Sequence, residues 1–323
     1  MKKQFSWHTL PLVLWRKGVN FFHVVRQAAG EFHSDNALKL SASLSYYTLF
    51  SLAPMLIIAI AISSIYFGKE AAEGYVYKQF EGLMGPLGAM QLQEMIRNVH
   101  ISGDTPWVTA ISIITLLFGA TGVFVEIQDS INTIWSLKVK PKRSWVKFLE
   151  DRLLSFSLIV GVGFLLLVSL ITSAMLNMIY DYLAPILGQY VLLTIAITQV
   201  IDIGTVILIF SVIFKVLPDA KLKWRDVLTG ASFTAVLFLG GKWVVNYYLG
   251  KSATVSIYGA AGAVVLIILW IYYSSAILFF GAEFTKVYAN KHGGKIRPNA
   301  FAVFIEKKEV VVDHVVLHTE EPK

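Results

Sequence analysis

The sequence contains no cysteine, and this absence excludes disulfide bonds, thiolate metal sites and cysteine nucleophiles. Charged residues are also few: Asp, Glu, Lys and Arg make up 15% of the 323 residues, against roughly 25% in an average soluble domain. Hydrophobic residues reach 56%, and the mean hydropathy is +0.63. This composition excludes an ordinary soluble domain and indicates an integral membrane protein.

Motifs for enzymatic chemistry are missing as well. The seven histidines are scattered, without an HxHxDH-like cluster for a catalytic metal, and there is no P-loop for ATP hydrolysis. His314 and His318 have the four-residue spacing of metal ligands on a helix, but their β-branched neighbours favour a strand. We therefore expect no enzyme, no metal and no cofactor.

Six stretches of the chain are long and apolar enough to cross a bilayer, which takes ~20 residues of helix. They lie at about 39–67, 107–127, 153–178, 191–214, 227–248 and 258–284. We predict an all-α membrane protein, a six-transmembrane-helix bundle, with residues 37–289 as the transmembrane domain. Residues 1–36 then form an amphipathic N-terminal segment, and residues 290–323 form a tail that alternates like a strand from 302 to 318.

Lysine and arginine alternate between the two sides of the predicted membrane. The N-terminal segment has six, the loops after the second and fourth spans have six and four, and the tail has seven. The intervening segments have three, none and one. By the positive-inside rule both termini are cytoplasmic. The net charge of +7 is then a belt that faces anionic headgroups, so membrane lipids are the expected partner, and nucleic acid is not.

Two helical segments flank the first span. Trp15, Val19, Phe22 and Val25 repeat at helical spacing beside basic residues. This pattern is typical either of an amphipathic helix on the membrane surface or of a cytosolic helix packed on the end of the bundle. The polar segment 68–106 has helical periodicity on both sides of a break at 85–88, which predicts a helical hairpin or cap on the periplasmic side.

The first span is polar on two faces. Its hydroxyl-bearing side chains lie on nearly opposite sides of a helix: Ser41, Ser45 and Thr48 on one, and Ser43, Tyr47 and Ser51, together with Pro54, on the other. The strip left for lipid is narrow: Ala42, Tyr46, Leu49 and Ala53. Such a span needs protein or a water-lined cavity on both polar faces. We therefore predict that it is the central helix of the bundle.

Five ionisable side chains lie within or at the ends of the other spans: Glu126, Asp129, Asp202, Lys242 and Glu283. A charge near the bilayer centre costs on the order of 2.5–3.5 kcal/mol, so each needs a partner or a cavity. One interpretation is a polar path that runs from Lys242 through Asp202 to the three remaining carboxylates at the inner mouth. The first span would line it with Ser43, Tyr47, Ser51 and Pro54.

Structural alternatives account for the same residues. Asp202 and Lys242 differ in depth by about a turn and a half, within reach of a lysine stem, and can form a buried ion pair. Glu126, Asp129 and Glu283 can be interfacial carboxylates paired with the basic loops. Glu126 and Asp129 also share a helical face with Gly119 and Gly122, a face that admits a closely packed neighbour.

Four stretches give the chain a resemblance to a known family. They are SASLSYYTLFSLAP from Ser41, FGATGVFVEIQDSINTIW from Phe118, FKVLPDAKLKWRDVLTGA from Phe214 and YGAAGAVVLIILWIYYSSAILFFGAEFTKVYA from Tyr258. In order and spacing they resemble the YihY/BrkB family of bacterial inner-membrane proteins over residues 37–289. The resemblance implies a six-helix inner-membrane protein linked to envelope integrity, and to serum resistance in one branch. Members were once labelled ribonuclease BN, a label that the histidine pattern does not support.

Three functions follow from these observations. The first is a transporter or translocator that moves a lipid, another amphiphile or an envelope precursor along the polar path. The second is a scaffold that binds other envelope proteins or a second copy of the chain. The third is an enzyme, for which the sequence offers no catalytic constellation. We expect the first function, with the second as its alternative.

Overall fold

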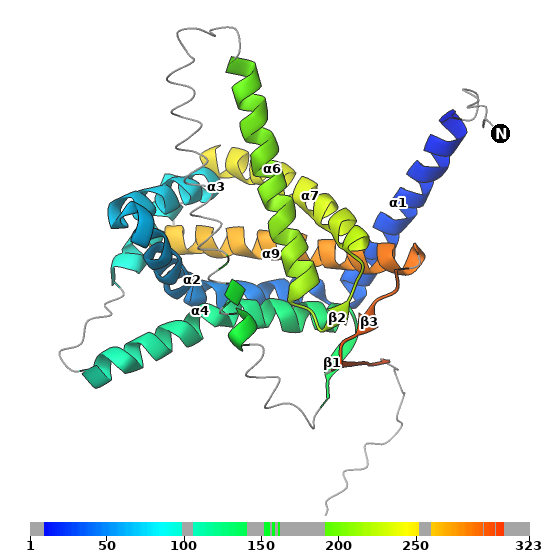
Figure 1. Ribbon diagram of the computed structural model, residues 1–323. Coiled ribbons are helices and arrows are strands. Elements are labelled where there is room, and N and C mark those ends of the chain that lie inside the picture. The colour runs from blue at the N-terminus through cyan, green and yellow to red at the C-terminus, as the bar shows by residue number, and fades with distance from the viewer. Residues whose placement is uncertain are drawn as a thin grey trace, which may run out of the picture.

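Figure 1 shows the computed structural model of the chain, which is mostly helical. It describes residues 10–98, 106–140, 152–155, 157–158, 161, 191–251, 260–292, 294–300 and 302–306. The helices are α1 (Leu10–Ser34), α2 (Ala37–Phe67), α3 (Lys69–Asn98), α4 (Pro106–Ile134), α6 (Val191–Val216), α7 (Trp224–Lys251) and α9 (Ala260–Lys291). The strands are β1 (Leu137–Val139), β2 (Ala220–Lys221), β3 (Arg297–Pro298) and β4 (Ala302–Phe304).

The long helices coincide with the predicted spans. Helices α2, α4, α6, α7 and α9 cover the first, second, fourth, fifth and sixth spans, and the third span lies largely outside the described residues. Among the described residues, Ala37–Ala61 and Ile267–Lys291 are long and apolar enough to cross a membrane, and Ile203–Val216 is a shorter apolar helix. The helical fold class is therefore confirmed, and six spans with cytoplasmic termini stay a prediction.

Helix α2 lies at the centre of the described bundle, as its two polar faces predict. It packs against α1, α3, α4 and α9, and α9 shares the centre because it packs against α7 as well as α1, α2, α3 and α4. In Figure 1, α2, α9 and α4 run side by side. Leu44, Ile131, Phe214 and Phe279 of α2, α4, α6 and α9 form one continuous apolar core, so the bundle is held by long-range contacts.

Helices α2 and α4 approach closely where α4 carries glycines. A Cβ on Gly119 would lie 3.3 Å from Pro54 Cγ, and a Cβ on Gly122 would lie 2.9 Å from Ser51 Oγ. The second distance is shorter than a normal van der Waals contact, so a larger side chain at residue 122 would require the Ser51 hydroxyl to move. The prediction that the Gly119/Gly122 face admits a close neighbour is confirmed, and that neighbour is the first span.

The Ser41/Ser45 face of α2 is satisfied by protein, one of the two environments expected for it. Ser41 Oγ donates to the Ala37 carbonyl at 2.8 Å, and Ser45 Oγ donates to the Ser41 carbonyl at 2.7 Å, both within the helix. Ser41 and Ser45 are buried. Because these hydroxyls bond to their own backbone, they need no water-lined cavity, and they pack as small side chains between helices.

The strip of α2 assigned to lipid is partly wrong. Ala42 and Tyr46 are exposed, but Ala53 is buried with 5% of its surface exposed. The exposed strip instead turns toward Tyr47 and Phe50, whose rings join Tyr46 in edge contacts. Helix α2 is covered on more of its circumference near residue 53, because α3, α4 and α9 all pack against it.

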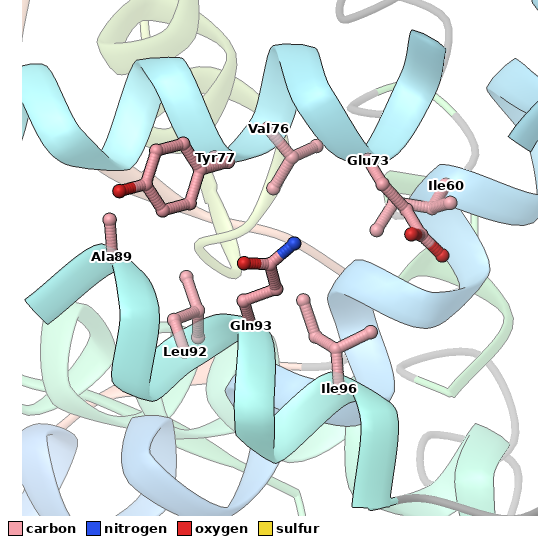
Figure 2. Close-up of a pocket in the computed structure, with 8 residues that line it drawn as sticks. All are labelled: Ile60, Glu73, Val76, Tyr77, Ala89, Leu92, Gln93 and Ile96. Atoms are coloured by element: carbon pink, nitrogen blue, oxygen red, sulfur yellow. The ribbon is translucent and has the colours of Figure 1, made fainter. Parts of the chain in front are cut away.

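Helix α3 folds back on itself and lies against one end of the bundle. Its backbone is helical from Lys69 to Asn98 and includes Pro86. A straight helix would separate Val76 from Leu92 by about 24 Å, yet both line the same small cavity beside Ile60 of α2 (Figure 2). Helix α3 packs against α2, α7 and α9, so a helical hairpin that caps the bundle is confirmed. Its periplasmic location stays a prediction.

The strands join loops at the opposite end of the bundle (Figure 1). Strand β1, after α4, pairs antiparallel with β4, and Lys138 lies opposite Val303. Strand β2, between α6 and α7, pairs antiparallel with β3, and Lys221 lies opposite Arg297. The predicted strand in the tail is confirmed for Ala302–Phe304, and residues 307–323, with His314 and His318, lie outside the described residues. Three segments predicted to be cytoplasmic therefore meet at one end.

Candidate functional site

The predicted path residues do not share one surface. Ser51 is buried against Gly122, Pro54 packs on Gly119, Ser43 is half-buried and Tyr47 is exposed. Among the charged residues, Glu126 and Lys242 are half-buried, Asp129 is exposed, and the side chain of Asp202 lies outside what the structure describes. The Asp202–Lys242 ion pair therefore stays a prediction. Glu283 is the path residue with the most distinctive surroundings.

Glu283 belongs to a charged cluster between α1, α4 and α9. The ammonium of Lys286 lies 2.8 Å from Glu31 Oε2, 3.2 Å from Asp35 Oδ2 and 3.0 Å from Glu283 Oε2. It also donates to the carbonyl of Ile134, at the end of α4, at 2.8 Å. One lysine thus joins three helices and is shared by three carboxylates. We call Glu31, Asp35, Glu283 and Lys286 the charge cluster.

Burial differs sharply within the charge cluster. The Glu283 side chain is 0% exposed, whereas those of Glu31, Asp35 and Lys286 are 28%, 14% and 16% exposed. Glu283 Oε1 has no hydrogen-bond partner among the described residues. A buried carboxylate normally receives several hydrogen bonds. The half of Glu283 that faces away from Lys286 therefore lacks the donors that an ionised carboxylate needs.

Local sequence rules bring the cluster together. Glu283 and Lys286 are three residues apart on one face of α9. Glu31 lies in the last turn of α1, and Asp35 follows in the turn after it, where its backbone N–H still donates to the Glu31 carbonyl at 2.8 Å. Asn36, in the left-handed conformation with φ 54°, separates α1 from α2. Asparagine tolerates this conformation better than most residues. The turn directs α1 back along the end of α9.

Apolar contacts hold α1 beside the cluster. Val24 and Ala28 of α1 are buried with Phe284 and Val287 of α9. The rings of Phe32 and Phe280 are in edge contact, with centroids 5.7 Å apart. For residues 20–34 this arrangement agrees with a helix packed on the end of the bundle, the second of the two alternatives for the N-terminal segment. Phe22 is 65% exposed, so its apolar side chain lies outside the contact between α1 and α9.

A second polar group ties the same end of the bundle together. Asn132 Nδ2 donates to Asp219 Oδ2 at 2.9 Å, and the Asp219 backbone N–H donates to Asn132 Oδ1 at 2.9 Å. The Asn299 backbone N–H donates to the Asp219 carbonyl at 2.9 Å. Asp219 and Asn132 are buried. This pair joins α4, the α6–α7 loop and the tail, and its complete hydrogen bonding indicates a structural role.

The sequence prediction missed Glu31, Asp35 and Lys286. Spacing could have indicated them, because Glu283 and Lys286 form an i,i+3 pair and Glu31 and Asp35 an i,i+4 pair. Their joint position depends on α1 folding back onto α9, which no local pattern indicates. Asp219 also escaped notice, because it lies in a short loop and outside every predicted span.

A small cavity lies at the other end of the bundle, inside the fold of α3. Figure 2 shows Glu73, Val76 and Tyr77 on one arm of α3 and Leu92 and Ile96 on the other, with their side chains around a common space. Its volume, measured to the centre of a water-sized sphere, is about 20 Å³. One water molecule needs roughly 10–15 Å³ by this measure. The cavity has room for one water molecule and is too small for an acyl chain.

No group of three or more His, Cys, Asp or Glu side chains in the described part of the chain has the geometry of a metal site. Within these residues Lys286 and Asp219 each join several elements of the bundle. Long apolar helices with charge buried between them agree with the α-helical membrane class that the composition predicts.

The chain belongs to the BrkB virulence factor family, whose profile matches residues 28–303. It is 29% identical over 260 residues to a UPF0761 membrane protein of Azotobacter vinelandii, a match that covers 78% of this chain and 60% of that protein. It is 27% identical to a UPF0761 membrane protein of Tolumonas auensis, over 78% of this chain and 80% of the relative. No solved structure matches the chain.

The relatives also bear on the question of an enzyme. A Bacillus subtilis relative named a ribonuclease-like protein, YfkH, is 25% identical over 75% of this chain. That name describes the relative alone. The family is one of membrane proteins and not an enzyme family, in agreement with the expectation from the histidine pattern. The membrane class predicted from composition is confirmed.

Proposed function

We propose that this protein translocates a lipid or another amphiphile across a bacterial inner membrane, with both termini in the cytoplasm, and that the charge cluster controls the movement. The observation that carries the proposal is the full burial of Glu283 next to a lysine that two other carboxylates share. A carboxylate in the apolar part of a membrane protein is costly, and in known cases such groups commonly mark transport pathways or proton relays.

If the charge cluster had a purely structural role, fewer charged side chains would be enough. One buried ion pair is enough to fix the register of two helices, and even one pair contributes little more than a packed apolar contact. Here one ammonium is divided between Glu283 on α9, Glu31 on α1 and Asp35 in the turn after α1. The cluster therefore has more than one way to distribute its contacts, which suits a protein that changes conformation during a cycle.

The lipid-facing surface supports an amphiphilic cargo. Helix α2 exposes Tyr46, Tyr47 and Phe50 beside the half-buried Ser43. An amphiphile has an apolar chain for the aromatic strip and a polar head for the hydroxyls. The cargo would then move along the outer side of α2 and not through a closed pore, because Ser51 and Pro54 are packed against α4. This modifies the predicted path but keeps the first span as its lining.

Close packing at Ser51 and Pro54 favours the alternative, a scaffold without transport. A dry α2–α4 interface and a cavity of about 20 Å³ are what a rigid membrane partner for envelope proteins would have. Such a protein would bind another envelope protein or a second copy of itself. The two functions differ in one measurable property, the movement of lipid between leaflets.

Reconstitution of the full chain tests the proposal. Liposomes would contain a phospholipid with a fluorescent headgroup, and dithionite added outside would bleach only the headgroups of the outer leaflet. A translocator brings inner-leaflet lipids outward, so bleaching should exceed that of protein-free liposomes. Bleaching equal to that of empty liposomes, with the protein folded and inserted, would contradict the proposal for this class of cargo and favour the scaffold.

A further inference from the structure

The proposed translocation needs a driving force, and the sequence contains no P-loop through which the chain could use ATP. The charge cluster offers another source. Lys286 already occupies the centre of the three carboxylates, at 2.8–3.2 Å, and supplies the positive charge that they share. A second cation would therefore have to bind to a single carboxylate oxygen without displacing Lys286, and a proton is small enough to do so.

We infer that Glu283 is a proton-binding site, and that its proton controls how firmly α1 is held to α9. This inference rests on the proposed function for its role in a cycle, but the site itself is defined by the geometry of Glu283, Lys286 and Glu31. A hydronium ion of the solvent supplies the proton: one of its O–H bonds breaks, an O–H bond forms at Glu283 Oε1, and a neutral water molecule is released.

The two oxygens of Glu283 have different surroundings. Oε2 accepts a hydrogen bond from Lys286 at 3.0 Å. Oε1 is buried and has no hydrogen-bond partner in the described part of the chain. The charged groups that act on Glu283 are Lys286 on α9, Glu31 on α1 and Asp35 in the turn after α1, and α4 contributes the Ile134 carbonyl beside Lys286. Apart from Lys286, every one of these groups carries negative charge or a carbonyl dipole.

The proton changes how Lys286 distributes its contacts. When Glu283 is ionised, it competes with Glu31 and Asp35 for one ammonium, which weakens the link between α9 and α1. When Glu283 is protonated, it loses that charge attraction, and Lys286 is left to Glu31 at the end of α1 and Asp35 in the turn after it. Protonation should therefore tighten the docking of α1, and proton release should loosen it. Glu31 and Glu283 both contact Lys286, so their competition for it does not depend on Asp35.

Infrared spectroscopy of the full chain in lipid nanodiscs measures the protonation directly. A protonated carboxyl has a C=O band that an ionised carboxylate lacks. Titration of the wild type from about pH 6 to pH 9, where exposed carboxylates stay ionised, should show one buried carboxyl band disappearing. The Glu283→Gln variant should lack this band, and a Glu70→Gln variant, altered at an exposed glutamate on α3, should keep it. A band that survives in Glu283→Gln would overturn the assignment.

The docking of α1 gives an independent readout. Because the chain has no cysteine, spin labels can be placed through Phe22→Cys and Leu228→Cys, at exposed positions on α1 and α7. The short-distance population should grow on acidification in the wild-type background and stay high at every pH in Glu283→Gln. A Lys286→Met variant should show the loosened state at every pH. An unchanged pH dependence in either variant would contradict the inference. Neither measurement depends on lipid transport, so the inference and the proposed function fail separately.

Discussion

Thr285 packs directly on Gly230. Its Oγ1 lies 1.9 Å from the point where a Cβ on residue 230 would stand, so α9 touches the bare backbone of α7. The contact is reciprocal, since Thr234 Oγ1 lies 1.9 Å from the corresponding point on Gly281. Each threonine also donates to the carbonyl of the glycine four residues earlier in its own helix, at 2.7–2.8 Å. Two glycine–threonine pairs therefore hold the helix that carries Glu283 in register.

Replacement of Gly230 by alanine should destabilise the bundle. The new methyl group would overlap Thr285, and an overpacked interface costs about 1–3 kcal/mol. A lower midpoint of thermal unfolding in detergent is the expected result. The control is Gly240→Ala on the same helix, where nothing lies within 4 Å of a new Cβ. The close contact would be refuted if both variants unfolded alike, and Thr285→Ala should partly rescue Gly230→Ala.

The burial of each position on α2 predicts how strongly a leucine substitution there lowers the folded yield. Ser45→Leu and Ser51→Leu should lower the folded yield, because both serines are buried at helix interfaces. Ala53→Leu should be equally harmful because Ala53 is 5% exposed, although the sequence alone assigns it to lipid. Ala42→Leu, at an exposed position, is the matched control and should be mild. Yields from size-exclusion chromatography would decide, and a harmless Ala53→Leu would restore the original assignment.

Much of the fold follows from periodicity and charge. The apolar runs locate α2, α4, α6, α7 and α9, and the small residues of α4 predict its close contact with α2. The burial of Ala53 could not be predicted, because it depends on which helices surround α2 at that level. Likewise, Glu283 could be identified as an unusual charge, but Glu31 and Asp35, which share Lys286 with it, lie about 250 positions earlier in the chain. Contacts of this range have no local signature.

Reporter tags test the predicted topology. A tag after Lys3 and a tag after Lys323 should both report the cytoplasm, and a tag near Gly85 in α3 should report the periplasm. The physical reason is the concentration of Lys and Arg in the segments that meet at the strand end of the bundle. Accessibility to a membrane-impermeant reagent in whole cells measures this, and an external signal from either terminus would exclude the six-span arrangement.

Asp202 and Lys242 remain a separate question that a double substitution can answer. If they only form an ion pair, replacement of both by apolar residues of similar size should leave protein level and lipid movement near normal, because a buried pair contributes little relative to apolar packing. Normal folding with lost lipid movement would instead make them part of the working path. Single replacements are expected to be worse than the double one, since each leaves one charge unpaired.

The central claim is that the charge cluster controls lipid translocation, and Lys286 is its shared centre. The most direct measurement is the rate of dithionite-accessible lipid exchange in liposomes that contain equal amounts of folded wild type, Lys286→Met or Lys291→Met. Lys291 is an exposed lysine near the end of the same helix, so its variant controls for charge alone. The account predicts at least a ~10-fold loss of rate in Lys286→Met, equivalent to about 1.4 kcal/mol, and a normal rate in Lys291→Met. Equal rates in all three proteins would contradict it.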